Sequence, residues 1–269
     1  MSAIALVAWL LVGGQLLSAG RFLGEAGWPA AVLVLALVIA TLMSLARQLP
    51  GQNVLLAATI IGLMGGGAHG LAAATAIPFG PIHFTDEAGP RLLGLLPWPM
   101  PAIWIVALLN SRGVARLILR PWRKARAYGF WLMGMTAALT VLFALALDSF
   151  ASQVRHYWLW QPTRLPLDWH GAPVVNFLGW LVATLMILAF ATPAFIDKRP
   201  RARPLPPDYH PLAIWLLCLT LFAAAAVVHK LRIAAGFCLL TGAVVAVLAG
   251  FIPRKWEAHR TLVPPPASR

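Results

Sequence analysis

Eight runs of mostly apolar residues, each about as long as a membrane-spanning helix, limit what this chain can fold into. A helix needs roughly 20 such residues to cross a bilayer. The runs lie at about 3–20, 28–46, 53–77, 98–117, 128–148, 174–196, 211–229 and 233–252. With 60% hydrophobic and 11% charged residues, the composition excludes a soluble enzyme, a disordered tail and a disulfide-rich secreted domain. The sequence therefore predicts an all-α, polytopic integral membrane protein with about eight transmembrane helices.

The basic residues predict which side of the membrane each segment occupies. They cluster after the fourth run, after the sixth run and in the C-terminal tail, as Arg120, Arg123, Lys124 and Arg126, then Lys198, Arg199, Arg201 and Arg203, then Arg254, Lys255, Arg260 and Arg269. With eight spans these segments share one side, which the positive-inside rule makes cytoplasmic. We therefore expect both termini to be cytoplasmic, a single transmembrane domain over 1–252 and a basic, Pro-containing cytoplasmic tail over 253–269. The first run lacks the basic start of a secretory signal, so we expect it to be retained.

The net charge of +13 indicates contact with anionic lipid headgroups and not with nucleic acid. Five of the eight acidic residues and three of the histidines fall on the other side of the membrane, and all of these except Glu25 lie in or beside outer loops at about 78–97 and 149–173. Loops of that length between spans are uncommon unless they function or are disordered, and their aromatic residues argue against disorder. Both loops are therefore candidates for a functional site.

In the first outer loop, three prolines and two glycines between Ile77 and Pro90 fix a non-helical path at the end of a span. His83 and Asp86 lie three residues apart within it. This pattern fits a functional site, and it also fits an ordinary interfacial turn in which Asp86 caps the next helical turn.

Near the second loop, Asp148 ends the fifth run and Asn176 begins the sixth. Ionisable groups at that depth are costly and are candidates for function. The intervening Trp158 and Trp160 fit an aromatic belt at the membrane interface. Within Gly65–Gly70, the glycines favour close helix packing, and His69 either packs against neighbouring helices or faces a cavity.

Several chemistries are excluded by spacing. No two histidines are closer than 14 residues, which argues against a membrane di-iron oxygenase, and no D-D or D-x-x-x-D pair occurs to hold Mg²⁺ on a diphosphate. The G-x-G-x-x-G match at Gly65–Gly70 lies inside an apolar span, so it does not indicate a dinucleotide site. We expect no metal and no cofactor. A transporter is disfavoured because no inverted repeat is evident.

The two outer segments together resemble a known family. The stretch PFGPIHFTDEAGP at 78–90, followed by Gly94, Pro97 and Trp104, is similar to P-F-G-x-Y-x-Y-T-x-x-L-G-P of the carotenoid biosynthesis membrane proteins, which include carotenoid 1′,2′-hydratases of bacteria and the bisanhydrobacterioruberin hydratase of archaea. Asp148, Trp160 and GAPVVNFLGW at 171–180 match its second block. The resemblance covers about residues 60–197. Ile82, Phe84, Ser149 and Trp169–His170 depart from the family pattern.

The resemblance implies a hydro-lyase in a bacterial or archaeal inner membrane. Such an enzyme adds water to the terminal C=C of an acyclic carotenoid end group, without a redox cofactor, and gives a tertiary alcohol. It needs a proton donor, a group that orients water and aromatic faces that stabilise a carbocation. We assign the acid to Asp148, or to Asp86 if their roles are exchanged, in one shared cavity, and the orientation of water to His83 or Asn176. The expected substrate contacts are Phe79, Phe84, Trp104, Trp160, His170, Phe177 and Trp180.

The family departures keep a second hypothesis open. The chain would then be a non-catalytic subunit that binds a carotenoid or assembles a pigment–protein complex in the membrane. Expected partners under either hypothesis are an acyclic carotenoid and membrane lipids, with a homo-oligomer or a larger membrane complex left open.

Overall fold

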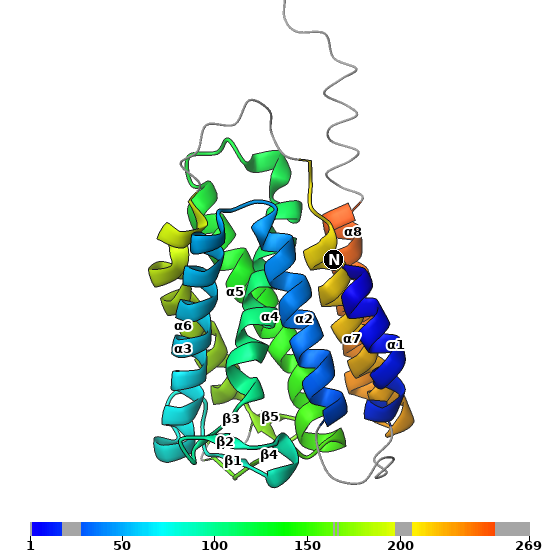
Figure 1. Ribbon diagram of the computed structural model, residues 1–269. Helices are drawn as coiled ribbons and strands as arrows, with labels where there is room; N and C mark the ends of the chain where they lie inside the picture. The colour runs from blue at the N-terminus through cyan, green and yellow to red at the C-terminus, as the bar shows by residue number, and fades with distance from the viewer. Residues whose placement is uncertain (1, 18–27, 164, 166, 197–205, 251–269) are drawn as a thin grey trace, which may run out of the picture.

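The computed structural model describes residues 2–17, 28–163, 165, 167–196 and 206–250. This part of the chain forms eight α-helices that alternate in direction (Figure 1). They are α1 (Ser2–Leu17), α2 (Trp28–Ala46), α3 (Gly51–Thr75), α4 (Pro99–Ile118), α5 (Tyr128–Asp148), α6 (Val174–Ala191), α7 (His210–Val228) and α8 (Arg232–Gly250). The predicted runs agree with these helices within a few residues at each end, and the all-α class is confirmed.

Six helices in the described ranges are long and apolar enough to cross a membrane. These are α3, α4, α5 with its extension to Val154, α6 with its extension to Phe195, α7 and α8. Of the other two, α2 contains a shorter apolar helix, Ala30–Ala46, and α1 is described over 16 residues. The chain is thus a multi-pass integral membrane protein.

The short strands gather at one end of the helical bundle, and α1 begins at the other end (Figure 1). The connection from α4 to α5, which includes a 3₁₀ turn at Arg120–Trp122, lies at the end where α1 begins. The first predicted basic cluster is therefore opposite the strands, as expected. The second cluster, at 198–203, and the tail over 253–269 lie outside the described residues.

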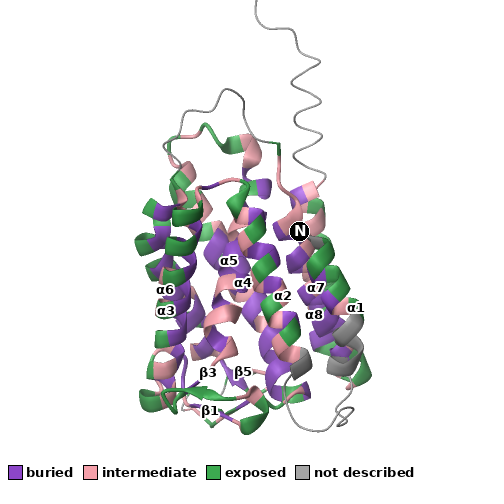
Figure 2. Ribbon diagram, viewed as in Figure 1, coloured by how far each residue is buried: buried purple, intermediate pink, exposed green. Residues whose placement is uncertain are grey.

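Apolar side chains cover the outside of the bundle as well as its inside. The largest fully buried ones include Trp104, Trp215 and Phe79, whereas Leu63 and Phe130 are 71% and 80% exposed. Figure 2 shows exposed residues along the outward sides of the helices and buried residues where the helices face one another. Such an outer surface is unfavourable in water and suits contact with lipid chains.

Helix α4 packs against α2, α3, α5, α7 and α8, so it forms the centre of the bundle. Small residues allow this close approach. A Cβ atom at Gly113 of α4 would lie 2.4 Å from the Cβ of Pro211 in α7, so only glycine fits there.

The outer loops form three two-stranded antiparallel ribbons, which the sequence did not predict. They pair β1 (Ile82–Phe84) with β4 (Trp158–Trp160), β2 (Arg91–Leu92) with β3 (Leu96–Pro97), and β5 (Asp168–Trp169) with β6 (Ala172–Pro173). A 3₁₀ turn at Asp86–Ala88 follows β1. The β1–β4 ribbon joins the first outer loop to the second and so connects the two sequence motifs.

Candidate functional site

The register of the β1–β4 ribbon decides which motif residues face the protein interior. Ile82 pairs with Trp160, His83 with Leu159, and Phe84 with Trp158. Because side chains alternate along a strand, His83 and Leu159 share the exposed face, while Phe84 and Trp158 are buried. The rings of Phe84 and Trp158 meet edge to face, with centroids 6.3 Å apart.

The carboxyl group of Asp148, at the end of α5, accepts hydrogen bonds from three side chains. Its Oδ1 accepts from Nε1 of Trp158 at 2.9 Å and from Nε1 of Trp160 at 2.8 Å. Its Oδ2 accepts from Nδ2 of Asn176, near the start of α6. The two-residue period of β4 puts both indoles on one side of the strand, so a single oxygen receives both N–H groups. Only 3% of the Asp148 surface is exposed.

Asn176 is buried beside this carboxyl group. Its Oδ1 has no hydrogen-bond partner among the described residues. Since an amide can rotate by 180°, Oδ1 can instead face Asp148 and accept a hydrogen bond from a neutral carboxyl group. After Asp148 the chain continues as a π-helical turn, Ser149–Val154, in which the Ser152 hydroxyl donates to the Asp148 carbonyl at 2.7 Å. Turns of this kind occur frequently at functional sites.

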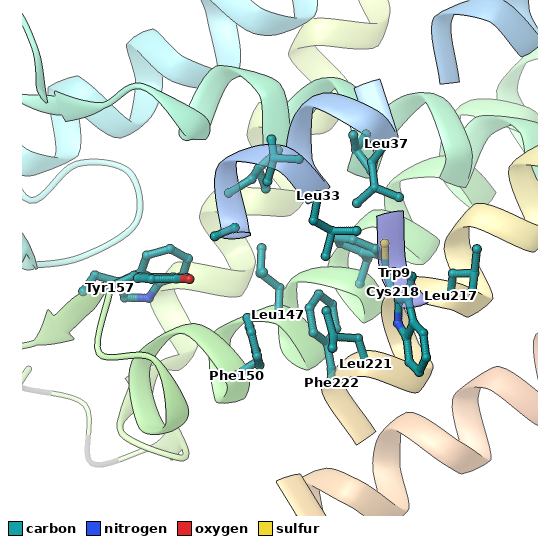
Figure 3. A pocket seen from close by; sticks show the side chains of 16 residues that line it. Trp9, Leu33, Leu37, Leu147, Phe150, Tyr157, Leu217, Cys218, Leu221 and Phe222 are labelled. Atoms are coloured by element: carbon teal, nitrogen blue, oxygen red, sulfur yellow. The ribbon is translucent and has the colours of Figure 1, made fainter. Parts of the chain in front are cut away.

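An apolar cavity with an accessible volume of about 80 Å³, here called the inner cavity, lies between α1, α2, α4, α5 and α7 (Figure 3). Its walls are almost entirely hydrocarbon and aromatic, as in Leu33, Phe150 and Phe222. A second cavity with an accessible volume of about 270 Å³, the outer cavity, lies beneath the first outer loop, where Glu87 and Trp98 line it. Mostly apolar walls are typical of cavities that bind hydrophobic ligands.

The two cavities are adjacent, because five residues line both: Ala30, Val34, Ile103, Tyr157 and Trp158. Asp148 lines neither of them. Trp158 lines both cavities and donates its indole N–H to Asp148, so it is the contact between the apolar space and the buried carboxyl group.

A separate aromatic cluster joins α3, α4, α6 and the first outer loop. Trp104 and Trp180 are stacked with centroids 3.9 Å apart, and His69 stacks on Phe79 at the same distance. Nε1 of Trp104 donates to Nδ1 of His69 at 3.0 Å, which requires that nitrogen to be unprotonated. All four residues are buried. His69 is therefore a hydrogen-bonded residue of the packed interior, which was one of its two predicted roles.

Gly65→Ala is expected to destabilise the protein, because this aromatic cluster rests directly on the glycine. A Cβ atom at Gly65 would lie 2.3 Å from Cγ of Trp104. Overpacking of this kind costs about 1–3 kcal/mol of unfolding free energy. At Gly67, on the same helix, an added Cβ atom would meet nothing within 4 Å, so Gly67→Ala is the matched control. Thermal unfolding in detergent measures both, and equal unfolding temperatures for the two variants would contradict the packing role of Gly65.

Of the predicted catalytic residues, the structure brings together Asp148 and Asn176 but not Asp86 or His83. The Asp86 carboxylate is exposed and pairs with Arg91 at 3.2 Å. His83 is exposed on the outer face of β1. The two aspartates therefore do not share a buried cavity, contrary to expectation, because the chain turns outward after β1.

The predicted substrate contacts divide between two places. Trp160 and Phe84 belong to the ribbon over Asp148, whereas Phe79, Trp104 and Trp180 belong to the packed aromatic cluster. Phe177 is buried on α6. His170 is half-buried and meets Trp169 edge to face, with centroids 4.9 Å apart.

None of the predicted catalytic or substrate-contact residues lines either cavity. Among the lining residues that the sequence analysis did not assign to the site are Tyr157, Trp158 and Glu87. The alternation of Trp158, Leu159 and Trp160 was a usable signal, since a strand would turn both indoles to one side. No group of three or more metal-binding side chains gathers within the described part of the chain.

Comparison with known proteins gives one match. The family model described as carotenoid biosynthesis protein matches residues 29–245. No curated protein and no solved structure matches the chain. The family that the two outer motifs indicated is therefore confirmed over most of the sequence.

Proposed function

This chain belongs to the carotenoid biosynthesis protein family, and we propose that it hydrates the terminal C=C bond of an acyclic carotenoid end group. The alkene takes a proton at its less substituted carbon and becomes a tertiary carbocation. The oxygen of a water molecule then bonds to the cation and gives up a proton, which returns to the deprotonated acid and leaves a tertiary alcohol. Alkene and water account for every atom and electron of the product, so the reaction needs no oxidant or reductant.

The observation that carries this proposal is the buried Asp148, hydrogen-bonded to a tryptophan that lines both cavities. Asp148 is the proton donor in this mechanism. Because it lines neither cavity, the indole of Trp158 has to move aside for the alkene to come within reach of the carboxyl group. The three N–H groups of Trp158, Trp160 and Asn176 stabilise the carboxylate that remains when the proton has left, since hydrogen bonds to an ionised acceptor are the stronger ones. Asp86 has neither this burial nor these partners.

The adjoining cavities suit a long apolar substrate. Their walls offer hydrocarbon and aromatic surface to a polyene, which has no polar group to satisfy. The indole ring of Trp158 lies where it can meet the end group, and an aromatic face stabilises a nearby cation. The carboxylate that remains on Asp148 adds a favourable negative charge near the cation.

Tyr157 is placed to orient the attacking water. Its ring lines both cavities, and its hydroxyl oxygen accepts a hydrogen bond from Nε of Arg155 at 3.3 Å. In Figure 3 the hydroxyl points toward the other residues of the inner cavity. Burial raises the pKa of Tyr157, so the hydroxyl keeps its proton at neutral pH.

Tyr157→Phe is therefore expected to lower alcohol formation by about 10²-fold or more, while protonation of the substrate continues. In D₂O, a carbocation that is not captured by water loses a proton and returns as a deuterium-labelled alkene. Mass spectrometry of recovered substrate should show this label in the variant, whereas Asp148→Asn should show neither label nor alcohol. Alcohol formation at the unaltered rate would remove Tyr157 from the mechanism.

Expression in cells that accumulate lycopene or γ-carotene, followed by pigment analysis, tests the function itself. The expected result is a new pigment heavier by one water and carrying a tertiary hydroxyl group. If no acyclic end group acquires a hydroxyl while the protein is present in the membrane, the hydratase proposal is wrong.

A second candidate is a non-catalytic carotenoid-binding or assembly subunit. It is favoured by the almost wholly apolar inner cavity and by the engagement of both Asp148 oxygens in hydrogen bonds. This role predicts that the purified protein retains a stoichiometric, chemically unaltered carotenoid, or a large partner complex, and that Asp148→Asn leaves the bound pigment unchanged.

A further inference from the structure

At the end of the bundle opposite the strands, a groove with an accessible volume of about 270 Å³ lies between α4, α5 and the end of α6. Two guanidinium groups line it, from Arg112 on α4 and Arg126 just before α5. The rest of its lining is largely apolar and includes Phe130, Met133 and Leu188. It is separate from the inner and outer cavities and has no part in the proposed reaction.

Arg112 is unusually deep for a charged residue. It lies six residues before Ile118, where α4 ends, or about 9 Å along the helix axis from that end. The side chain is half-buried, and its Cζ lies 3.8 Å from the ring centroid of Phe195. Among the described residues no carboxylate forms an ion pair with Arg112 or with Arg126. A cation at this depth is costly unless an anion or water accompanies it.

The hydroxyl groups that line the groove already donate hydrogen bonds within the protein. The hydroxyl of Thr136 donates to the carbonyl of Leu132, and that of Thr192 to the carbonyl of Leu188, each at 2.6 Å. The donors left for a ligand are therefore guanidinium N–H groups, whose planar fork matches a phosphate.

We propose that this groove binds the phosphate of an anionic phospholipid, with its acyl chains along the apolar wall. The charge of the two arginines favours an anion, and the wall favours hydrocarbon. Phe130 continues that wall outward, where it is 80% exposed on the surface that faces lipid. The groove lies at the end that the positive-inside rule makes cytoplasmic, and basic pockets between helices on that side bind acidic headgroups. A free phosphate would contact the two arginines but would leave the apolar wall of the groove unoccupied.

The test uses delipidated full-length protein in neutral detergent, with phosphatidylglycerol or phosphatidylcholine of the same chain length added. Native mass spectrometry counts bound lipid, and thermal unfolding reports its stabilising effect. Phosphatidylglycerol should bind and stabilise, whereas phosphatidylcholine and inorganic phosphate should not. Arg112→Gln and Arg126→Gln should each weaken binding about fivefold, since each removes one cationic contact. The matched control is Arg123→Gln, an exposed arginine of the same segment outside the groove, which should bind normally.

Arg126 is exposed, so its substitution tests the groove even if Arg112→Gln does not fold. Equal loss of binding in Arg123→Gln would show a diffuse charge effect and overturn the proposal. Equal stabilisation by inorganic phosphate would show that the groove binds a free anion and not a phospholipid, and would overturn the proposal. Asp197 lies outside the described residues. Its carboxylate is the alternative partner for Arg112. If Arg112→Gln and Asp197→Asn destabilise lipid-free protein equally and neither changes phosphatidylglycerol binding, then Arg112 forms an ion pair with Asp197 and the proposal is wrong.

Discussion

Asp148→Asn should abolish hydration of the carotenoid end group while the amount of protein in the membrane stays unchanged. The variant loses the acidic proton, and general acid catalysis typically contributes about 10² to 10⁴ in rate. Pigment analysis in carotenoid-accumulating cells, normalised to protein level by immunoblot, measures the effect.

The fold should tolerate this substitution because the hydrogen bonds around Asp148 can be kept. An amide oxygen at this position can still accept from the two indole N–H groups of Trp158 and Trp160. The introduced amide nitrogen would face Asn176, whose Oδ1 has no partner among the described residues and can rotate to accept from it. Asp148→Ala differs, because it leaves the buried donors of Trp158 and Asn176 unpaired at about 1–3 kcal/mol each, as well as the half-buried donor of Trp160. That variant should lose protein as well as activity.

Two exposed aspartates serve as controls. Asp168 accepts a hydrogen bond from the backbone N–H of Gly171 at 2.9 Å, which an asparagine oxygen can also accept, so Asp168→Asn should be mild. Asp86→Asn removes a surface ion pair, and such pairs contribute little to stability. If Asp148→Asn is active and Asp86→Asn is inactive, the proton donor is Asp86 in the first outer loop. Activity in both variants would refute acid catalysis by this pair.

The helices could be predicted because lipid imposes a simple rule on sequence. A spanning segment must satisfy its own backbone hydrogen bonds and must be apolar over about 20 residues, so each run of this kind becomes a helix. The family motifs likewise pointed to the region around Asp148 and Asn176, since polar groups near lipid depth are rarely accidental. Both features depend on composition within short windows of the chain.

The ribbon over Asp148 could not be predicted in the same way, because it pairs residues more than 70 positions apart. His83 was proposed to orient water because its loop resembles the family motif, yet the register of β1 against β4 turns it outward. The same register makes Trp158 a wall of both cavities, although an interfacial belt seemed a sufficient account of it. Cavities present a similar difficulty, since their walls come from helices distant in sequence.

Val34→Trp should block conversion of the carotenoid by closing the junction of the inner and outer cavities. Val34 is half-buried on α2 and lines both cavities, so a tryptophan side chain would fill space that the substrate needs. A displacement of about 1 Å can already cost about 10² in rate, and we expect a loss at least that large. The control is Val32→Trp, the same change two residues away on a side chain that is 42% exposed toward lipid. It should leave conversion and protein level near normal.

The two main variants separate binding from chemistry when purified protein is analysed for retained pigment. Asp148→Asn should hold unconverted substrate, because the cavities are intact and only the acid is lost. Val34→Trp should hold little or none, because the acid is intact and the space is lost. If Val34→Trp converts substrate as well as Val32→Trp does, the carotenoid does not pass through this junction. A cavity elsewhere would then have to bring the end group to Asp148, and Trp158 would be left as a structural support for that carboxyl group.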